Sequence, residues 1–329
     1  MKILVVAPSW IGDTLMAQPL LMRLAGRGAI IDVLAPDWCA PLYRRMPEVR
    51  CILSSPFRHG DFAFNDRRAL GRCLRTEGYD EAIVLPNSWK SALVPFFAAI
   101  PKRTGYQGEA RWGLLNHRHR LDKSRHPRLV ERYAQLAEPP GGALPGALPD
   151  PRLDSSPEQQ RTARDALGLA GTDAPYILCP GAEYGPAKRW PSRHFATLAR
   201  HLAGHGPVWL MGSEKDAPLG EEIVSLSGGA ARNLCGNSSL EQAIDLIAGA
   251  RAVVSNDSGL MHVAAALDRP LVALYGSSSP DYTPPLSPRA KILTLNLSCS
   301  PCFERECPLG HFKCLTDLAP EQVIAALNA

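Results

Sequence analysis

The stretch Arg251–Gly276, RAVVSNDSGLMHVAAALDRPLVALYG, constrains the fold more than any other part of the chain. Small and β-branched residues at 252–255 predict a buried strand, and the apolar run Leu271–Tyr275 predicts a second. Between them, Asn256–Gly259 forms a turn and N-cap cluster that opens a short apolar helix over Leu260–Leu267. Two apolar strands joined by a helix imply a parallel sheet, with the turn at a strand's carboxyl end.

Open α/β sheets bind ligands at the carboxyl ends of their strands, and a helix N-terminus there suits a phosphate. We therefore expect Asp257, Ser258 and Gly259 to contact an anionic ligand. His262 falls in the first turns of the helix, from where its imidazole could approach a diphosphate. The alternatives are an ordinary capped helix for the turn and a packed core residue for the histidine.

The bulk composition is that of a globular protein, with 329 residues of which 45% are hydrophobic and 21% charged. This length is sufficient for two domains with full cores. No apolar run approaches the roughly 18 residues of a membrane span. The opening run MKILVVAPSW stops at Pro8 and reads as a first strand, so we expect a cytoplasmic protein. Nine scattered Cys without a secretory signal argue against a disulfide framework.

Charge is distributed unevenly along the chain. Residues 1–137 hold 21 Lys/Arg against 12 Asp/Glu, whereas residues 138–329 hold 15 against 20. The excess of positive charge predicts an anionic partner for the first half, and a solvated Arg-rich surface is the alternative. Aromatic residues do not interleave with the basic ones as base stacking requires, so we expect no nucleic-acid partner.

Strand and helix patterns alternate along the chain, which predicts an α/β fold of two Rossmann-like, doubly wound domains facing across a cleft. The Pro- and Gly-rich segment Glu138–Pro157 reads as a linker and places the domains at 1–150 and 151–329, the second ending in a Cys-rich segment and a terminal helix. The expected strands are Lys2–Ala7, Ile30–Ala35, Val49–Leu53, Ala82–Pro86, Tyr176–Pro180 and Val208–Met211, besides the two named above. The expected helices are Thr14–Leu24, Asn65–Thr76, Ser88–Ala98, Pro127–Ala137, Ser192–Ala203, Glu221–Leu226 and Leu240–Ala248.

Three further loops follow predicted strands and carry polar residues. In the first, PSWIGDTLMAQP, Asp13 sits at or near a helix N-cap, where it either acts as a general base or only caps the helix. In the second, PGAEYGPAKRWP, Lys188 suits a diphosphate, Glu183 and Tyr184 could contact a sugar or base, and Ser192 is the expected helix cap. In the third, Glu214 could accept hydrogen bonds from ribose hydroxyls.

A cluster of cysteines near the end of the chain reads CSPCFERECPLGHFKC. Cys299, Cys302, Cys307 and Cys314 lie within sixteen residues, and thiolates at such density are typical of zinc or iron–sulfur sites. Their spacing matches no common zinc motif. The alternative is a stretch of reduced, partly buried thiols. If this segment binds a metal, we expect a structural site and not a catalytic one.

Taken together, PSWIGD, PGAEYGPAKRWP, SNDSGLMHVAAAL and SCSPCFERECPLGHFKC resemble the motifs of the ADP-heptose:lipopolysaccharide heptosyltransferases, and most of all those of type II. The resemblance covers essentially the whole chain. It implies a GT-B fold, with the acceptor bound by the first domain and ADP-heptose by the second. It also implies metal-independent, inverting transfer of heptose, without a cofactor, to the first heptose of the lipopolysaccharide inner core. The acceptor would be anionic and lipid-anchored, with peripheral contact at the cytoplasmic face of the inner membrane.

Residue roles follow from the resemblance where the motifs match. Asp13 corresponds to the presumed base, Lys188 to the lysine that contacts phosphate, and Glu214 to an acid on the adenosine side. The donor diphosphate and heptose contacts correspond to Asp257, Ser258, Gly259 and His262. No individual acceptor residue carries over. The rival hypotheses are a heptosyltransferase for another core acceptor, a nucleotide-sugar epimerase on the same fold, and a non-catalytic binding module stapled by zinc.

Overall fold

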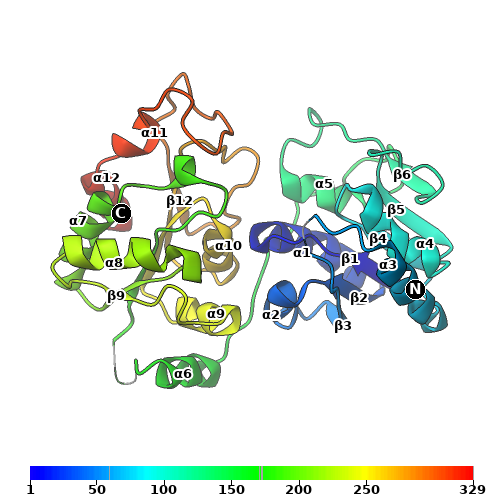
Figure 1. Ribbon diagram of the computed structural model, residues 1–329, viewed down its shortest axis with the longest axis horizontal. Coiled ribbons are helices and arrows are strands. Elements are labelled where there is room, and N and C mark those ends of the chain that lie inside the picture. Colours follow the sequence, from blue (N-terminus) through cyan, green and yellow to red (C-terminus); the bar gives the residue numbers. More distant parts are fainter. Residues whose placement is uncertain (59, 170, 172, 329) are drawn as a thin grey trace. The chain divides into compact units, whose positions relative to one another are not determined.

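The computed structural model describes residues 1–58, 60–169, 171 and 173–328 (Figure 1). The chain divides into two compact units, unit 1 over Met1–Pro151 and unit 2 over Arg152–Ala329. Each unit is built on one six-stranded sheet in which neighbouring strands run parallel. Because helices connect successive parallel strands, the predicted α/β fold of two Rossmann-like units is confirmed.

The sheet of unit 1 has the strand order β3-β2-β1-β4-β5-β6. Its central strands β1 and β4 are covered on both faces, which explains their nearly continuous apolar sequences KILVV and EAIV. The strand order reverses between β1 and β4, and this is the switch point at which such sheets bind ligands. The strands are β1 (Lys2–Val6), β2 (Ile30–Ala35), β3 (Val49–Ser54), β4 (Glu81–Val84), β5 (Lys102–Tyr106) and β6 (His117–His119).

Helices of unit 1 connect these strands. Helix α1 has Trp10 as its N-cap, so Asp13 lies inside the first turn and not at the cap itself. The helices are α1 (Ile11–Gly26), α2 (Ala40–Tyr43), α3 (Phe64–Cys73), α4 (Leu93–Phe97) and α5 (Leu129–Gln135), with 3₁₀ turns η1 (Asp37–Cys39), η2 (Leu74–Glu77) and η3 (Trp89–Ala92).

The sheet of unit 2 repeats the topology of unit 1, with the order β12-β11-β10-β7-β8-β9. Its switch point therefore lies between β7 and β10, which pair in parallel. The strands are β7 (Tyr176–Cys179), β8 (Val208–Leu210), β9 (Arg232–Asn233), β10 (Ala252–Asn256), β11 (Leu271–Leu274) and β12 (Ala290–Leu293). The helices are α6 (Pro157–Ala166), α7 (Ser192–Ala203), α8 (Ala217–Leu226), α9 (Leu240–Ala248), α10 (Gly259–Ala266), α11 (Lys313–Thr316) and α12 (Pro320–Asn328), with 3₁₀ turns η4 (Pro186–Lys188) and η5 (Glu214–Asp216).

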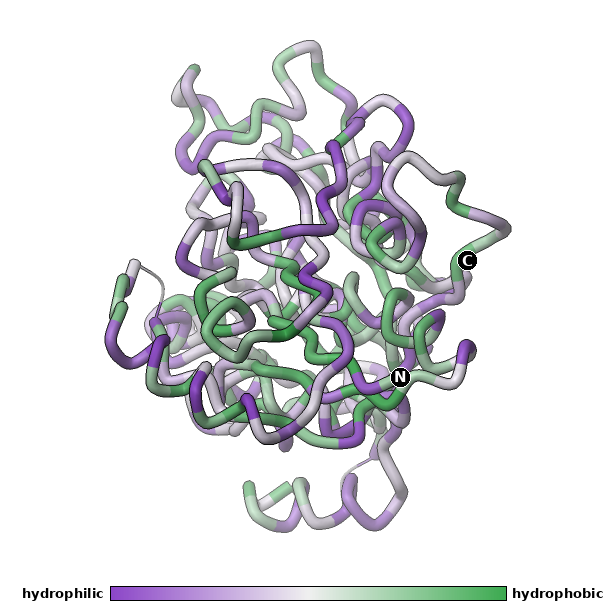
Figure 2. Tube along the Cα trace, turned by 90° about the vertical axis from the view of Figure 1, so that its right-hand side faces the viewer, coloured by the Kyte–Doolittle hydropathy of each residue, from purple (hydrophilic) through white to green (hydrophobic). Residues whose placement is uncertain are grey.

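Each unit has its own hydrophobic core, and Figure 2 shows hydrophobic and hydrophilic stretches alternating along the trace. In unit 2 the core joins strands β7 and β10 to helices α7 and α8, and it includes Val323 of the terminal helix α12. In unit 1 the core joins β1, β4 and the loop before α4. These cores fix the strand ends from which the candidate site residues project.

The expected cap of α7 is wrong, because its N-cap is Pro191 and Ser192 is the first helical residue. The expected N-cap cluster before α10 is confirmed, since Ser258 is the N-cap, although its Oγ lies 3.2 Å from Ser255 Oγ and makes no capping bond to the helix. The sequence patterns do not predict strands β5, β6, β9 and β12 or helix α6, because these segments are short or rich in charged residues.

Candidate active site

A buried ion pair occupies the switch point of unit 2. Lys188 ends the turn η4 after β7, and Asp257 directly follows β10. Lys188 Nζ lies 2.6 Å from Asp257 Oδ2, and the two side chains are only 18% and 6% exposed. A buried charge pair is costly unless its geometry is good and further hydrogen bonds satisfy it. The ammonium group retains two N–H bonds beyond the one that Asp257 accepts, so it can also bind an anion.

Asn256 links the end of β10, which precedes Asp257, to the loop after β7 that carries Lys188. The Trp190 backbone N–H donates to Asn256 Oδ1 at 3.1 Å, and Asn256 Nδ2 donates to the Pro180 carbonyl at 2.7 Å. The Asn256 side chain is fully buried, so these bonds are shielded from water. Trp190 is itself anchored by its indole N–H, which donates to the Leu318 carbonyl at 2.8 Å. The loop that carries Lys188 is therefore fixed at both ends before any ligand binds.

Several buried polar atoms at the same edge of the sheet lack a hydrogen-bond partner within the described residues. They include Arg189 Nε on the loop after β7, His262 Nδ1 on the second turn of α10, and the hydroxyls of Ser277 and Ser278, which follow β11. Burial lowers the pKa of His262 to about 4 although the charge of Asp257 opposes it, and the charge of Lys188 adds to the lowering, so the imidazole is neutral near pH 7. Buried polar groups are normally hydrogen-bonded, and such an unpaired set is typical of a polar ligand site.

The remaining sequence-predicted residues of unit 2 lie at its surface. Tyr184 is 40% exposed, and two cations lie near its ring, with Lys188 Nζ at 5.2 Å and Arg305 Cζ at 5.3 Å from the ring centroid. Glu183 forms an exposed ion pair of 2.6 Å with Lys215. Glu214 is also exposed, at the start of η5. A nearby acid is better ordered, since the buried Asp216 accepts the Ser213 N–H at 3.0 Å.

The Cys-rich segment Cys299–Cys314 docks onto this edge of the sheet. The Phe303 N–H donates to the Ser277 carbonyl at 2.7 Å, and Tyr184 Oη donates to the Phe303 carbonyl at 2.6 Å. The Arg305 carbonyl accepts the Ala187 N–H at 3.0 Å. Gly185 has a φ of 155°, and a Cβ there would lie 2.5 Å from the Arg305 carbonyl oxygen, so glycine is required for the contact. The segment is thus part of the site's wall.

The four thiols of this segment are free of disulfides. Burial raises the pKa of Cys314, and the neighbouring Cys302 and Cys307 thiols act in the same direction. Cys307 differs because backbone N–H groups, including that of Phe312 at 3.4 Å, lower its pKa. Among the described residues, no group of three or more His, Cys, Asp or Glu side chains is arranged to hold a metal ion.

Asp13 lies at the corresponding edge of unit 1. It is half-buried in the first turn of α1, after the loop that follows β1. Burial raises the pKa of the Cys39 thiol to about 11 and the charge of Asp13 contributes, which places the carboxylate near η1. The exposed indoles Trp10 and Trp38 belong to the same edge, and Trp38 Nε1 donates to the Ser9 carbonyl at 2.9 Å.

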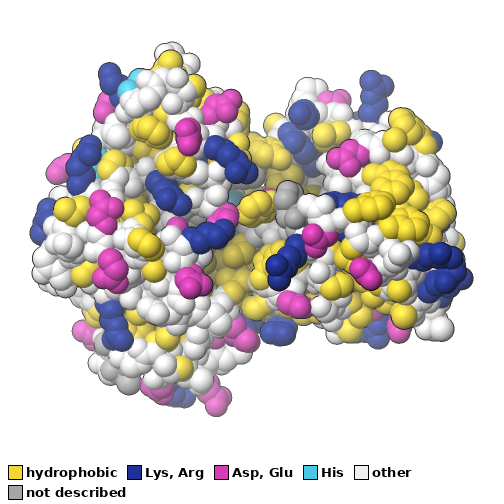
Figure 3. Space-filling view, viewed as in Figure 1, with side chains coloured by type: hydrophobic (Ala, Val, Ile, Leu, Met, Phe, Trp, Pro, Cys, Tyr) yellow, Lys and Arg dark blue, Asp and Glu magenta, His cyan; other side chains and the backbone are white. Residues whose placement is uncertain are grey.

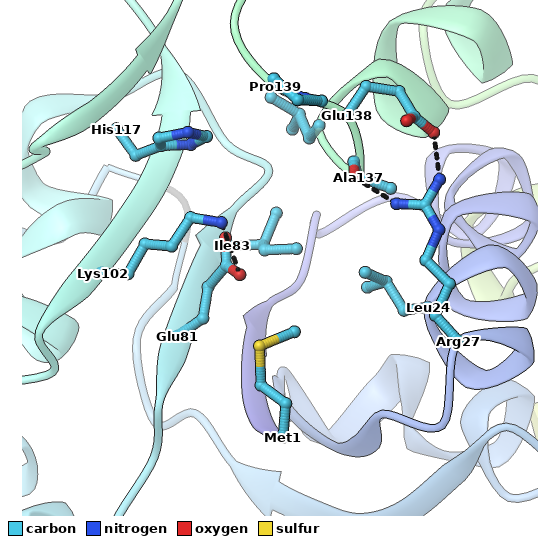
Figure 4. A pocket seen from close by; sticks show the side chains of 11 residues that line it. Met1, Leu24, Arg27, Glu81, Ile83, Lys102, His117, Ala137, Glu138 and Pro139 are labelled. Carbon is cyan, nitrogen blue, oxygen red and sulfur yellow. Dashed lines mark hydrogen bonds and ion pairs between the residues drawn. The ribbon is translucent and has the colours of Figure 1, made fainter. Parts of the chain in front are cut away.

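A pocket of about 290 Å³ in unit 1 lies away from these residues. It is lined by Glu81, Lys102 and His117, which begin β4, β5 and β6, so it opens at the amino edge of the sheet, opposite the edge of Asp13 (Figure 4). Its charges are largely paired within the protein. Lys102 Nζ lies 3.1 Å from Glu81, and Arg27 Nη2 lies 2.5 Å from Glu138. We assign this pocket no part in the chemistry.

Two sets of residues at the unit 2 edge were not predicted from the sequence. Ser277 and Ser278 follow β11 at the same edge as Lys188, so they could have been predicted from the tendency of loops after parallel strands to bind ligands. Arg305 could not have been found, because only the docking of the Cys-rich segment brings it to Tyr184. No helix of the described residues is both long and apolar enough to cross a membrane.

The two Rossmann-like units, each with a switch point at the carboxyl edge of its sheet, have the two-domain architecture of the GT-B glycosyltransferases. The family model for glycosyltransferase family 9 (heptosyltransferase) matches residues 67–313. Lipopolysaccharide heptosyltransferase 2 of Escherichia coli is 48% identical over 100% of this chain and 98% of its own, and lipooligosaccharide heptosyltransferase 2 of Haemophilus ducreyi is 46% identical over 100% and 99%. The structure of E. coli ADP-heptose lps heptosyltransferase II superposes with a TM-score of 0.90 at 47% identity, over 100% of this chain and 98% of that one. The chain belongs to the family 9 glycosyltransferases.

Proposed function

We propose that this glycosyltransferase transfers L-glycero-D-manno-heptose from ADP-heptose to the first heptose of the lipopolysaccharide inner core, with inversion at the anomeric carbon. The similarity to relatives named heptosyltransferase 2 along the full chain supports this donor and this acceptor. The observation that carries the proposal is the buried Lys188–Asp257 pair at the switch point of unit 2. It lies at the sheet edge where unpaired His262 and serine groups are ready to bind a polar ligand.

Unit 2 would bind the donor diphosphate. The N-terminus of α10 offers the free N–H groups of Ser258 and Gly259 together with the positive end of the helix dipole. Lys188 would donate to the phosphate next to the sugar, while Asp257 holds the ammonium in place. As the bond between the anomeric carbon and the ADP oxygen breaks, these groups stabilise the negative charge that develops on ADP. Neutral His262 would form a hydrogen bond to the donor, and it would not take up the proton that leaves the acceptor hydroxyl.

The nucleoside and sugar would lie along the neighbouring loops. Glu214 would accept hydrogen bonds from ribose hydroxyls, because it begins the turn after β8. Tyr184 and Glu183 would contact the base or the heptose from the loop after β7. Lys188 and Arg305 lie near the ring of Tyr184, so a ligand phosphate that draws Lys188 toward it would uncover part of the ring.

Unit 1 would bind the acceptor and supply the base. Asp13 would accept the proton of the attacking acceptor hydroxyl as its oxygen bonds to the anomeric carbon. Because a carboxylate is a weak base toward a sugar hydroxyl, proton transfer must accompany bond formation. The excess of basic residues in the first half suits an anionic, lipid-anchored acceptor at the cytoplasmic face of the inner membrane.

A product assay with three acceptor conditions tests this proposal. ADP-heptose is incubated with enzyme and no acceptor, with inner core lacking heptose, or with inner core bearing its first heptose, and the products are weighed by mass spectrometry. We expect one added heptose and stoichiometric ADP only with the heptose-bearing acceptor. Transfer to the heptose-free core would assign a different acceptor. Conversion of the donor without any acceptor would favour an epimerase.

A further inference from the structure

A continuous row of aromatic side chains lies on the surface of unit 1. The ring centroids of Phe62 and Trp89 are 5.8 Å apart, as are those of Phe62 and Phe64. Phe64 meets Phe97 edge-to-face at 5.5 Å, and Phe97 meets Phe96 in the same way at 5.5 Å. We call these five residues, which come from the loop before α3, from α3, from η3 and from α4, the aromatic patch.

Much of the aromatic patch is exposed to solvent. Phe62 is 54% exposed, Phe64 37% and Phe96 40%. Single exposed hydrophobic residues are common on proteins, but a contiguous exposed group marks an interaction surface. Figure 3 shows hydrophobic side chains gathered on the visible face of this unit, over the region of α3 and α4, with Lys and Arg beside them.

The patch is held rigidly from below. Gly71 of α3 packs so closely against α4 that an added Cβ would lie 2.6 Å from Phe97 Cβ. Arg67 Nε donates to the Phe62 carbonyl at 2.8 Å, and Arg75 Nε donates to the Phe97 carbonyl at 2.8 Å. Arg67 lies on α3 and Arg75 on the following turn η2, and their bonds fix the backbone at Phe62 and at Phe97. The aromatic surface is therefore preformed, and ordering it costs little when it binds.

Basic residues are frequent in the segments that form the aromatic patch. The segments 57–75 and 88–120 hold eleven Lys/Arg, of which Arg67 and Arg111 are buried, against the three acids Asp61, Asp66 and Glu109. Two of these acids serve the local fold, because Asp61 accepts the Arg58 N–H and Glu109 accepts the Trp89 N–H, both at 2.8 Å. The Arg103 guanidinium lies 5.6 Å from the Phe96 ring centroid. The surface thus combines flat apolar rings with a surplus of positive charge.

We infer that the aromatic patch and its arginines form a docking surface for an anionic lipid bilayer. Aromatic side chains favour the headgroup level of a membrane, where their rings bury apolar area. Arginine and lysine beside them gain attraction to anionic headgroups near the membrane surface. This charge complementarity favours a lipid surface over a neutral protein partner. The inference rests on the proposed function in that it assigns a surface to the proposed contact with the inner membrane, and vesicle binding tests it without regard to which sugars the enzyme uses.

Vesicle co-sedimentation of the full chain tests the docking surface, with vesicles of phosphatidylcholine alone or mixed with phosphatidylglycerol. We expect binding to the mixed vesicles, weakened by salt, and a loss of at least about five-fold in the partition coefficient for Phe62→Ser/Phe96→Ser. The matched control is Leu226→Ser/Ile292→Ser, which removes two exposed hydrophobic residues from unit 2. A second pair compares Arg68→Glu/Arg72→Glu on α3, where binding should fall, with Arg161→Glu on α6, where it should not.

The possible outcomes distinguish membrane docking from self-association. Unchanged partition of the Phe62→Ser/Phe96→Ser variant, or absence of wild-type binding to the mixed vesicles, would overturn the inference. Self-association of the wild type in lipid-free sedimentation velocity that the same variant abolishes would assign the patch to a second copy of the chain, which also overturns it. Transfer to a delipidated, water-soluble acceptor should be unchanged in this variant, so a failure of docking is distinguishable from a failure of the proposed reaction.

Discussion

The carboxyl edges of the two sheets differ sharply although the sheets share one topology. In unit 2 the edge holds a buried Lys188–Asp257 pair, a neutral His262 and unpaired serine hydroxyls. In unit 1 the edge holds the half-buried Asp13, with the exposed Trp10 and Trp38 on the same edge. The same fold can therefore present a cluster of buried polar groups on one sheet and a partly exposed carboxylate on the other. Function resides in the side chains at the strand ends, not in the fold.

Removing the carboxylate of unit 1 should have the largest effect on catalysis. Asp13→Asn keeps the size of the side chain but cannot accept the acceptor proton, so kcat should fall by about 10²–10⁴-fold. The control is Asp37→Asn, which removes an exposed carboxylate from η1 and should leave kcat nearly unchanged. Steady-state ADP release with saturating donor and acceptor measures both. If the two variants retain similar rates, Asp13 is not the base.

Breaking the ion pair of unit 2 should weaken donor binding and the fold together. Lys188→Gln removes a phosphate contact and leaves Asp257, 6% exposed, without its cation. We expect ADP affinity to fall by roughly 10–100-fold, and stability to fall by up to about 3 kcal/mol. Lys215→Gln removes a cation that is 75% exposed and should do neither. Calorimetric titration with ADP and thermal melts distinguish the variants, and equal behaviour would remove Lys188 from the site.

Buried histidines should make both units sensitive to acid. The pKa of His262 falls from 6.5 to about 4 because of burial, so the unfolded chain takes up a proton first as the pH drops. The contribution of neutral His262 to stability is thus complete above pH 6.5 and declines as the pH falls toward about 4, by about 3 kcal/mol in all.

His262→Asn should flatten that decline, whereas His201→Asn, which changes an exposed histidine of α7, should not. His119 of unit 1, whose pKa burial also lowers to about 4, should account for part of the slope that remains. Melting temperatures between about pH 7 and about pH 4.5 measure the effect, because this range spans most of the titration. A parallel decline in wild type and His262→Asn would show that the ring does not control acid stability.

The surface pair of unit 2 should have the smallest effect. Glu183→Gln breaks the contact with Lys215, but both side chains are mostly in water, at 49% and 75% exposure. We expect ADP affinity to change by less than about two-fold, because glutamine keeps a side-chain oxygen for the contact with the base or sugar and the lost exposed ion pair contributes little. Titration with ADP checks this, and a loss as large as that of Lys188→Gln would make Glu183 a principal donor contact.

Sequence reasoning found the central strands and the loops after them because buried parallel strands are nearly all apolar and end in polar turns. Strand β5, KRTGY, was not predicted, because its first two residues are cations and only the last three are buried, which leaves no clear apolar pattern. Sequence reasoning placed Lys188 and Asp257 at strand ends but could not pair them, since 69 residues separate them in the chain. It also treated the Cys-rich segment as a separate feature. The backbone contacts of Phe303 and Arg305 that make the segment part of the site's wall leave no sequence pattern.

The central claim is that the two sheet edges divide the work, with unit 2 holding the donor and unit 1 supplying the base. Titration of ADP into wild type and Asp13→Asn tests this division most directly, because it measures donor binding without chemistry. The account predicts dissociation constants that agree within about two-fold, since uniform donor binding does not require the base. A loss of affinity comparable to that of Lys188→Gln would place Asp13 in the donor site and contradict the division.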